Sequence, residues 1–124
     1  MKQLAFEIET VCGAITAEEL GITQTHEHIW LNAYEHYKDY RFVLEDEDTM
    51  VKELGEFTKL GGRSMVEVST AEIGRDPVAL RKISQRSGVQ IVMGSGWYRD
   101  FAYPREVEEK NSRELADLLI DEVE

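Results

Sequence analysis

Two histidines one residue apart, His26 and His28, are the residues whose types and spacing point most directly to chemistry. The stretch that leads into them, from Ile22, reads as a β-strand, and side chains alternate across a strand with period two. His26 and His28 would therefore share a face, with Glu27 pointing away toward a helix. Imidazole is the commonest metal ligand among side chains, so the pair predicts metal binding. The alternative is two hydrogen-bonded, metal-free histidines at a strand end.

Two imidazoles do not complete a zinc site, because zinc normally takes at least three protein ligands. The remaining histidine, His36, lies in an aromatic stretch where a lone histidine is more often solvated than ligating. The single cysteine, Cys12, precedes a turn, forms no intrachain disulfide and fits a reducing compartment. We therefore expect any further metal ligands to come from outside these residues.

Alternating strands and helices must position the histidine pair. The sequence predicts strands over residues 4–11, 22–31, 64–69 and 89–93, and helices over residues 46–60, 78–87 and 112–123. Residues 32–44 are predicted to form an irregular aromatic loop, which either lies ordered over a site or is anchored by its packing aromatic side chains. Strands that alternate with helices at these spacings indicate βα units and a parallel sheet. The histidines would then lie at the carboxyl end of the first βα strand, the edge where such folds build sites.

Local signals support two of the predicted helices. Asp76-Pro77 combines an N-cap residue with proline at the first helical position, and an ion pair between Arg75 and Asp76 is expected beside it. The helix over residues 46–60 is predicted from an apolar stripe at helical spacing, formed by Met50, Leu54, Phe57 and Leu60. The strand over residues 89–93 is largely apolar, which is typical of a strand buried on both faces.

Trp97 and Tyr98 follow the last predicted strand, after a Gly-Ser-Gly turn. That turn lacks the Lys-Ser/Thr of a P-loop and the full dinucleotide fingerprint, so it does not favour nucleotide binding. The glycines instead allow a sharp bend, from which Trp97 and Tyr98 would emerge at the same rim as the histidines. Either the two rings form the wall of a substrate pocket or they pack in the core.

Composition limits the class of protein. The 124 residues, 42% hydrophobic and 31% charged, suffice for one ordinary domain, here taken as residues 1–124. A net charge of −11 argues against nucleic acid as a partner, because phosphate binding requires clustered Lys and Arg. No apolar run approaches the roughly 18 residues of a membrane span, and no signal peptide is recognisable. We therefore expect a cytoplasmic protein without a membrane partner.

Three stretches resemble one known family. Residues 13–28, which end in Thr25-His26-Glu27-His28, resemble the opening signature of the phosphotriesterase family in the amidohydrolase superfamily. Residues 66–77 resemble its second strand and following loop, and residues 89–98 resemble its third. Gly96-Trp97-Tyr98 is more similar to the lactonases and phosphotriesterase-related members than to the organophosphate-degrading enzyme.

The resemblance implies an α/β fold, the N-terminal part of a TIM (β/α)8 barrel. Residues 1–124 would supply about three βα units with parallel strands, preceded by a short strand or hairpin, and so form an incomplete domain. It also implies a binuclear zinc-type centre, in which cobalt, manganese or iron are alternatives. His26 and His28 match the first-strand metal ligands, and Tyr98, with Trp97 beside it, matches the substrate pocket. The bridging ligand, the later histidines and the acid/base aspartate belong to later strands, so no catalytic residue is expected in this chain.

The implied function is that of a metal-dependent hydrolase. In the family, metal-bound hydroxide attacks the carbonyl of a small ester or lactone, or a phosphoester. We expect the 124-residue chain to be inactive by itself, and the complete enzyme to form a homo-oligomer such as a dimer. The alternative from another class is a small non-catalytic α/β module that binds metal or a protein partner.

Overall fold

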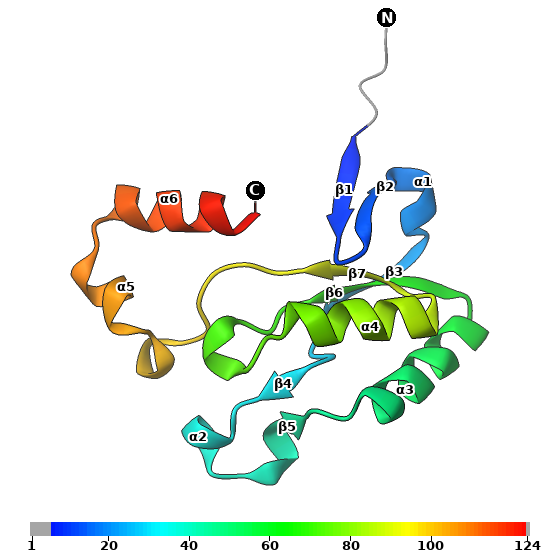
Figure 1. Ribbon diagram of the computed structural model, residues 1–124, viewed down its shortest axis with the longest axis horizontal. Helices are drawn as coiled ribbons and strands as arrows, with labels where there is room; N and C mark the ends of the chain where they lie inside the picture. Colours follow the sequence, from blue (N-terminus) through cyan, green and yellow to red (C-terminus); the bar gives the residue numbers. More distant parts are fainter. Residues whose placement is uncertain (1–5, 124) are drawn as a thin grey trace, which may run out of the picture.

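The computed structural model describes residues 6–123 and contains a three-stranded parallel sheet in the order β3-β6-β7 (Figure 1). The strands of this sheet are β3 (Ile22–Glu27), β6 (Gly62–Glu67) and β7 (Gln90–Met93). Helix α3 (Glu47–Lys59) lies in the connection from β3 to β6, and α4 (Pro77–Ser87) connects β6 to β7. The predicted α/β architecture with a parallel sheet is confirmed.

Smaller elements surround this sheet. They are β1 (Glu7–Thr10), β2 (Gly13–Thr16), α1 (Ala17–Leu20), β4 (Leu31–Asn32), α2 (Tyr34–Tyr37), η1 (Tyr40–Phe42), β5 (Val43–Leu44), η2 (Ala71–Ile73), η3 (Asp100–Ala102), α5 (Arg105–Glu109) and α6 (Ser112–Val123). Strands β1 and β2 form the predicted N-terminal hairpin, although residues 4 and 5 of the predicted strand lie outside the described part of the chain. No helix between residues 6 and 123 is long and apolar enough to cross a membrane.

The predicted aromatic loop contains more regular structure than expected. Strands β4 and β5 pair antiparallel, and α2 and η1 lie between them. Stacked aromatic rings stabilise this segment. The ring centroids of Tyr34 and Tyr40 are 4.5 Å apart, and so are those of Tyr37 and Phe42. Aromatic stacking of this kind adds stability beyond burial alone, which accounts for the local order.

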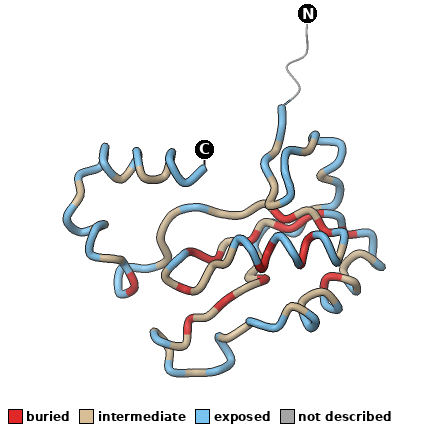
Figure 2. Tube along the Cα trace, in the orientation of Figure 1, coloured by how far each residue is buried: buried red, intermediate tan, exposed pale blue. Residues whose placement is uncertain are grey.

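The hydrophobic core lies between the sheet and the helices α3 and α4. Its buried members are Ile29, Leu54, Met65, Leu80, Ile83, Val89 and Ile91. Figure 2 shows the buried positions along the sheet strands and the adjacent side of α4. Helices α3 and α4 pack on the Ile91 face, whereas Val92 on the other face is only half-buried. The prediction of a strand buried on both faces is therefore wrong for these residues.

Helix α3 ends one residue earlier than its apolar stripe predicted. Leu54 is buried, and Met50 and Phe57 pack against the core, as expected. Leu60, however, is 87% exposed. It is the C-cap residue after Lys59, so helical periodicity no longer applies to its side chain.

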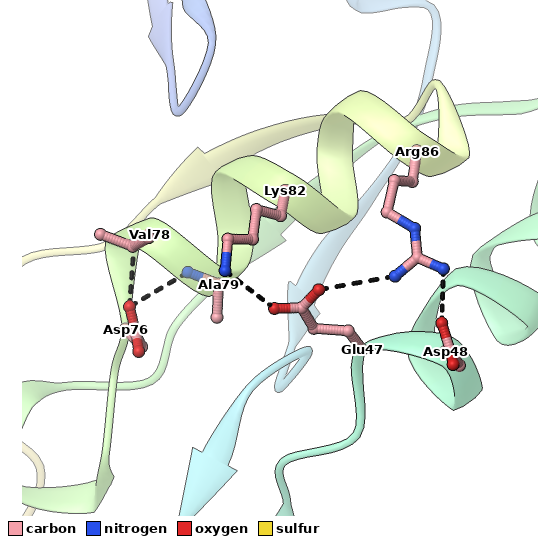
Figure 3. A network of polar contacts seen from close by, with 7 residues as sticks. All are labelled: Glu47, Asp48, Asp76, Val78, Ala79, Lys82 and Arg86. Carbon is pink, nitrogen blue, oxygen red and sulfur yellow. Dashed lines mark hydrogen bonds and ion pairs between the residues drawn. The ribbon is translucent and has the colours of Figure 1, made fainter.

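Helix α4 begins at the predicted cap. Asp76 Oδ1 accepts hydrogen bonds from the backbone N–H groups of Val78, at 2.9 Å, and Ala79, at 3.1 Å (Figure 3). The expected ion pair between Arg75 and Asp76 is not formed. Arg75 instead donates to the Gly94 carbonyl at 2.6 Å and pairs with Glu122, because its side chain turns toward the loop after β7.

Substituting Asp76→Ala is expected to lower the free energy of unfolding by about 0.5–2 kcal/mol, because two N–H groups of the first turn lose their acceptor. Asp76→Asn keeps an acceptor oxygen and is expected to retain most of that stability. Urea denaturation of the three proteins measures both effects. Equal losses in the alanine and asparagine variants would show that the charge of Asp76, and not its cap, carries the stabilisation.

Candidate metal centre

The histidine pair lies at the carboxyl end of β3. The register of β3 against β6 moves from Gln24↔Met65 to Glu27↔Glu67, so β3 carries one extra residue between these pairs. This irregularity, a bulge, contains His26. The ladder continues only to Glu27, whose carbonyl accepts from Val68 N–H at 3.0 Å. The predicted extension of this strand to about Leu31 is therefore wrong, and His28 lies just beyond the strand end.

The two imidazole rings nevertheless lie close together. Their centroids are 5.8 Å apart and their planes are nearly perpendicular, at 80°. His26 is exposed and His28 is half-buried. Glu27, between them, points elsewhere and accepts from Gln24 Nε2 at 2.9 Å, so it pairs within its own strand and not with a helix. Two adjacent, accessible imidazoles fit a shared metal ion as part of its ligand set.

His28 has a hydrogen-bond partner on the neighbouring strand end. Its Nδ1 lies 2.9 Å from Ser69 Oγ, and Ser69 is fully buried. When Nδ1 carries the proton it donates to this hydroxyl, which leaves the Nε2 lone pair free. Metal-ligating histidines almost always engage their second ring nitrogen in this way. The environment of His28 therefore fits a ligand that binds through Nε2.

Sequence reasoning missed Ser69 and the buried Glu67 as parts of this site. Both lie within the predicted strand over residues 64–69, and both are fully buried. The signal that could have found Glu67 is an acidic residue in a strand that otherwise faces a core, since a buried carboxylate requires specific partners.

Tyr98 and His28 line one small cavity. Its volume is about 90 Å³, and its other lining residues are Leu31, Ala33, Tyr37, Phe42 and Ile73. The hydroxyl groups of Tyr98 and Tyr37 are 2.6 Å apart, which fixes the Tyr98 ring at the cavity wall. The assignment of Tyr98 to a substrate pocket stays a prediction, now with a defined neighbourhood.

Trp97 lies in different surroundings. The half-buried indole lines a cavity of about 400 Å³ together with Pro104 and with Leu118 and Leu119 of α6. Within the described residues the two predicted pocket aromatics thus face separate cavities. A substrate role for Trp97 also stays a prediction.

Within residues 6–123, no third metal ligand joins the histidine pair. Among residues 6–123 no group of three or more His, Cys, Asp and Glu side chains could hold a metal ion. His36 is engaged elsewhere: its Nε2 lies 2.9 Å from the Glu72 carbonyl, and its ring meets Phe101 edge-on. Among the described residues, His26 and His28 therefore remain the two predicted metal ligands.

The hydrogen bond to Tyr37 raises the pKa of the Tyr98 hydroxyl above its ordinary value, and burial adds to the increase. A raised pKa means that, above the unfolded value of about 10, the folded state retains a proton that the unfolded state loses. The stabilising contribution is therefore complete below about pH 10 and is lost as the pH rises toward the folded pKa.

Tyr37→Phe should lower the pKa of Tyr98 and weaken this alkaline loss of stability. A pH titration that follows the NMR signal of the Tyr98 ring measures its pKa, and urea denaturation across the same alkaline range measures the stability. Tyr103→Phe, at a more exposed tyrosine, is the matched control and should leave the titration of Tyr98 and the stability curve unchanged. An unchanged Tyr98 titration in Tyr37→Phe would contradict the prediction.

Comparison with known proteins identifies the family of this chain. The sequence profile described as the phosphotriesterase family matches residues 6–124. N-acetyltaurine hydrolase of Salmo salar is 29% identical to this chain over an alignment 154 positions long. The alignment covers 99% of this chain and 44% of that protein. The chain thus spans less than half the length of this curated relative.

Two solved structures share the fold. A resiniferatoxin-binding protein from Rhodobacter sphaeroides superposes with a TM-score of 0.79 at 32% identity, covering 90% of this chain and 39% of that one. An amidohydrolase from Mycoplasma synoviae superposes with a TM-score of 0.85 at 25% identity, covering 95% of this chain and 35% of that protein. The parallel βα arrangement corresponds to the N-terminal portion of phosphotriesterase-like TIM barrels. With the profile matched over residues 6–124, the chain belongs to the phosphotriesterase family.

Proposed function

We propose that the protein carrying this chain is a metal-dependent hydrolase of small molecules, and that His26 and His28 are two of its metal ligands. One observation carries the proposal: two neighbouring imidazoles lie at the carboxyl edge of a parallel sheet, and one is oriented by Ser69 through Nδ1. Membership of the phosphotriesterase family supports the same conclusion.

When bound, a divalent ion such as zinc supplies Lewis-acid chemistry, which makes water nucleophilic at neutral pH and polarises the bond to be cleaved. Residues of this chain hold and enclose that group. His28 and His26 donate imidazole nitrogens, and Ser69 keeps the proton of His28 on Nδ1. Tyr98 and Tyr37 line the largely apolar cavity beside His28, and the contact between their hydroxyl groups holds the Tyr98 ring in place.

The remaining metal ligands and the group that accepts the proton are proposed to come from later strands of the barrel. Their absence between residues 6 and 123 is consistent with this division. The 124-residue chain by itself is accordingly proposed to be inactive.

The proposed substrate class is a small molecule with a hydrolysable carbonyl or phosphoester. The name of the Salmo salar relative describes hydrolysis of N-acetyltaurine, an amide. Lactones, esters and phosphoesters follow from the resemblance of the motifs. All of these substrates are cleaved through attack on a polarised C=O or P=O group, which one metal centre can promote.

The test is metal removal and replacement in the protein as its gene encodes it. A chelator should abolish hydrolysis across a panel of amides, lactones, aryl esters and phosphotriesters, and zinc, cobalt, manganese or iron should restore it. Hydrolysis that survives complete metal removal would contradict the proposal. Metal binding without hydrolysis of any panel member would instead favour the non-catalytic module.

A further inference from the structure

We propose that Glu67 is a positioning residue for His28. It holds the backbone at Ile29, the next residue in the chain, and it holds Ser69, whose hydroxyl contacts the imidazole ring. The inference rests on the proposed function only insofar as His28 is a metal ligand. Glu67 is the last residue of β6 and is fully buried, although it carries an ionisable carboxyl group. Burial of a carboxylate is costly unless strong hydrogen bonds compensate it, so its partners should define its role.

Both carboxylate oxygens of Glu67 bind backbone N–H groups. Oε2 accepts from Ile29 N–H, and Oε1 accepts from Ser69 N–H at 2.7 Å. These two N–H groups come from the segments that directly follow β3 and β6. The ladder between those strands ends at the bond from Val68 N–H to the Glu27 carbonyl, so neither group has a strand partner there. The Glu67 side chain thus supplies the acceptors that a neighbouring strand would otherwise provide for these two N–H groups.

The two anchored residues flank His28. Ile29 is its neighbour in the chain and is buried in the core with Met65. Ser69 contacts the ring itself, through the 2.9 Å contact between Oγ and Nδ1. The carboxylate therefore fixes the backbone that carries the imidazole and also the hydroxyl that orients it. Second contacts of this kind restrict the ring to one orientation and one tautomer.

An ion pair with Arg75 is the competing role for Glu67. Burial lowers the pKa of Arg75, and the charges of Glu72 and Glu67 partly offset this effect, so Arg75 lies within electrostatic reach. Its guanidinium, however, binds the Gly94 carbonyl and Glu122. The hydrogen bonds of Glu67 go to Ile29 and Ser69, which favours the positioning role.

The first experiment compares Glu67→Gln with Glu72→Gln in the protein as its gene encodes it. A glutamine keeps one acceptor but turns an NH₂ donor toward an N–H group, so one of the two backbone bonds is lost. Zinc affinity, measured by competition with a chromophoric chelator, should fall about 10–100-fold in Glu67→Gln. Glu72→Gln makes the same chemical change at carboxylate oxygens that have no hydrogen-bond partner in residues 6–123. Its zinc affinity should stay within about twofold of the original.

A conservative variant separates positioning from general stability. Glu67→Asp keeps both acceptor oxygens on a shorter stem, so it should recover part of the zinc affinity lost in Glu67→Gln. It also provides the measurement if Glu67→Gln does not fold. Ser69→Ala removes only the hydroxyl and should weaken zinc binding about 10-fold. Zinc affinity unchanged in Glu67→Asp and Ser69→Ala, or equal in Glu67→Gln and Glu72→Gln, would overturn the inference.

A second readout does not depend on metal. With ¹⁵N-labelled histidine, the ring nitrogens of metal-free His28 should report a single Nδ1–H tautomer, which Glu67→Gln and Ser69→Ala convert to a mixture. If the original protein takes up no zinc, the proposed function fails, and this measurement then decides the inference alone. His28 signals identical in all variants would refute it, whereas a loss of the single tautomer supports it.

Discussion

His28→Asn should reduce metal-dependent hydrolysis by at least about 100-fold, more than the loss expected for any residue that acts through a ligand. The half-buried imidazole offers Nε2 at the carboxyl edge of the sheet while Nδ1 contacts Ser69. Asparagine is shorter and its amide is a poor zinc ligand, so the ion would lose one of its protein donors. Steady-state kinetics together with the zinc content of the purified variant measure the effect.

His36→Asn is the matched control, because it makes the same substitution at a histidine whose ring is engaged by the Glu72 carbonyl. We expect activity and zinc content within about threefold of those of the original protein. This change is well below the loss expected for a residue that hydrogen-bonds to a metal ligand. Thermal denaturation of both variants separates unfolding from loss of metal. Equal losses of zinc in the two variants would contradict the assignment of His28.

Leu80→Ala should lower the free energy of unfolding by about 2–5 kcal/mol, the range for truncation of a fully buried leucine. Leu80 has no exposed surface and packs with Ile83 and Ile91 between α4 and the sheet. The substitution removes apolar contacts and leaves a cavity, and the rigid sheet limits collapse around it. Urea denaturation at constant pH provides the measurement.

Val78→Ala, on the same helix but 63% exposed, is the control for Leu80→Ala. Its effect should remain within about 0.5 kcal/mol, as is usual for surface positions. A loss below about 1 kcal/mol for Leu80→Ala would be inconsistent with a well-packed interface between α4 and the sheet.

The regular part of the fold could be predicted because it depends on local sequence. The strands, the helix start at Asp76 and the alternation of strands with helices follow from periodicity and capping chemistry. The family resemblance then indicated the barrel, which no local pattern contains.

The end of β3 could not be predicted in the same way. Residues 28–31 continue the apolar pattern of a strand, yet Ile29 N–H binds the side chain of Glu67, 38 positions away. A long-range hydrogen bond of this kind leaves no mark on local periodicity. The partner of Arg75 was missed for the same reason, because Glu122 is far from it in the sequence.

The two candidate metal ligands could be proposed from the sequence, but the residues that contact and support them could not. The spacing of His26 and His28 predicted that the two side chains lie close together, and the structure places their ring centroids 5.8 Å apart. Ser69, which contacts His28, is a small polar residue of a kind common after strands, so nothing in the sequence singled it out. The separate surroundings of Trp97 and Tyr98 depend on the loop after β7, whose path the sequence alone does not define.

An anomalous difference map tests the central claim most directly. Crystals of the protein as its gene encodes it, grown with zinc, would be measured on both sides of the zinc absorption edge. We predict a peak about 2.0–2.1 Å from Nε2 of both His26 and His28. A peak that contacts neither histidine, or no peak in crystals of a protein that hydrolyses its substrate, would contradict the account.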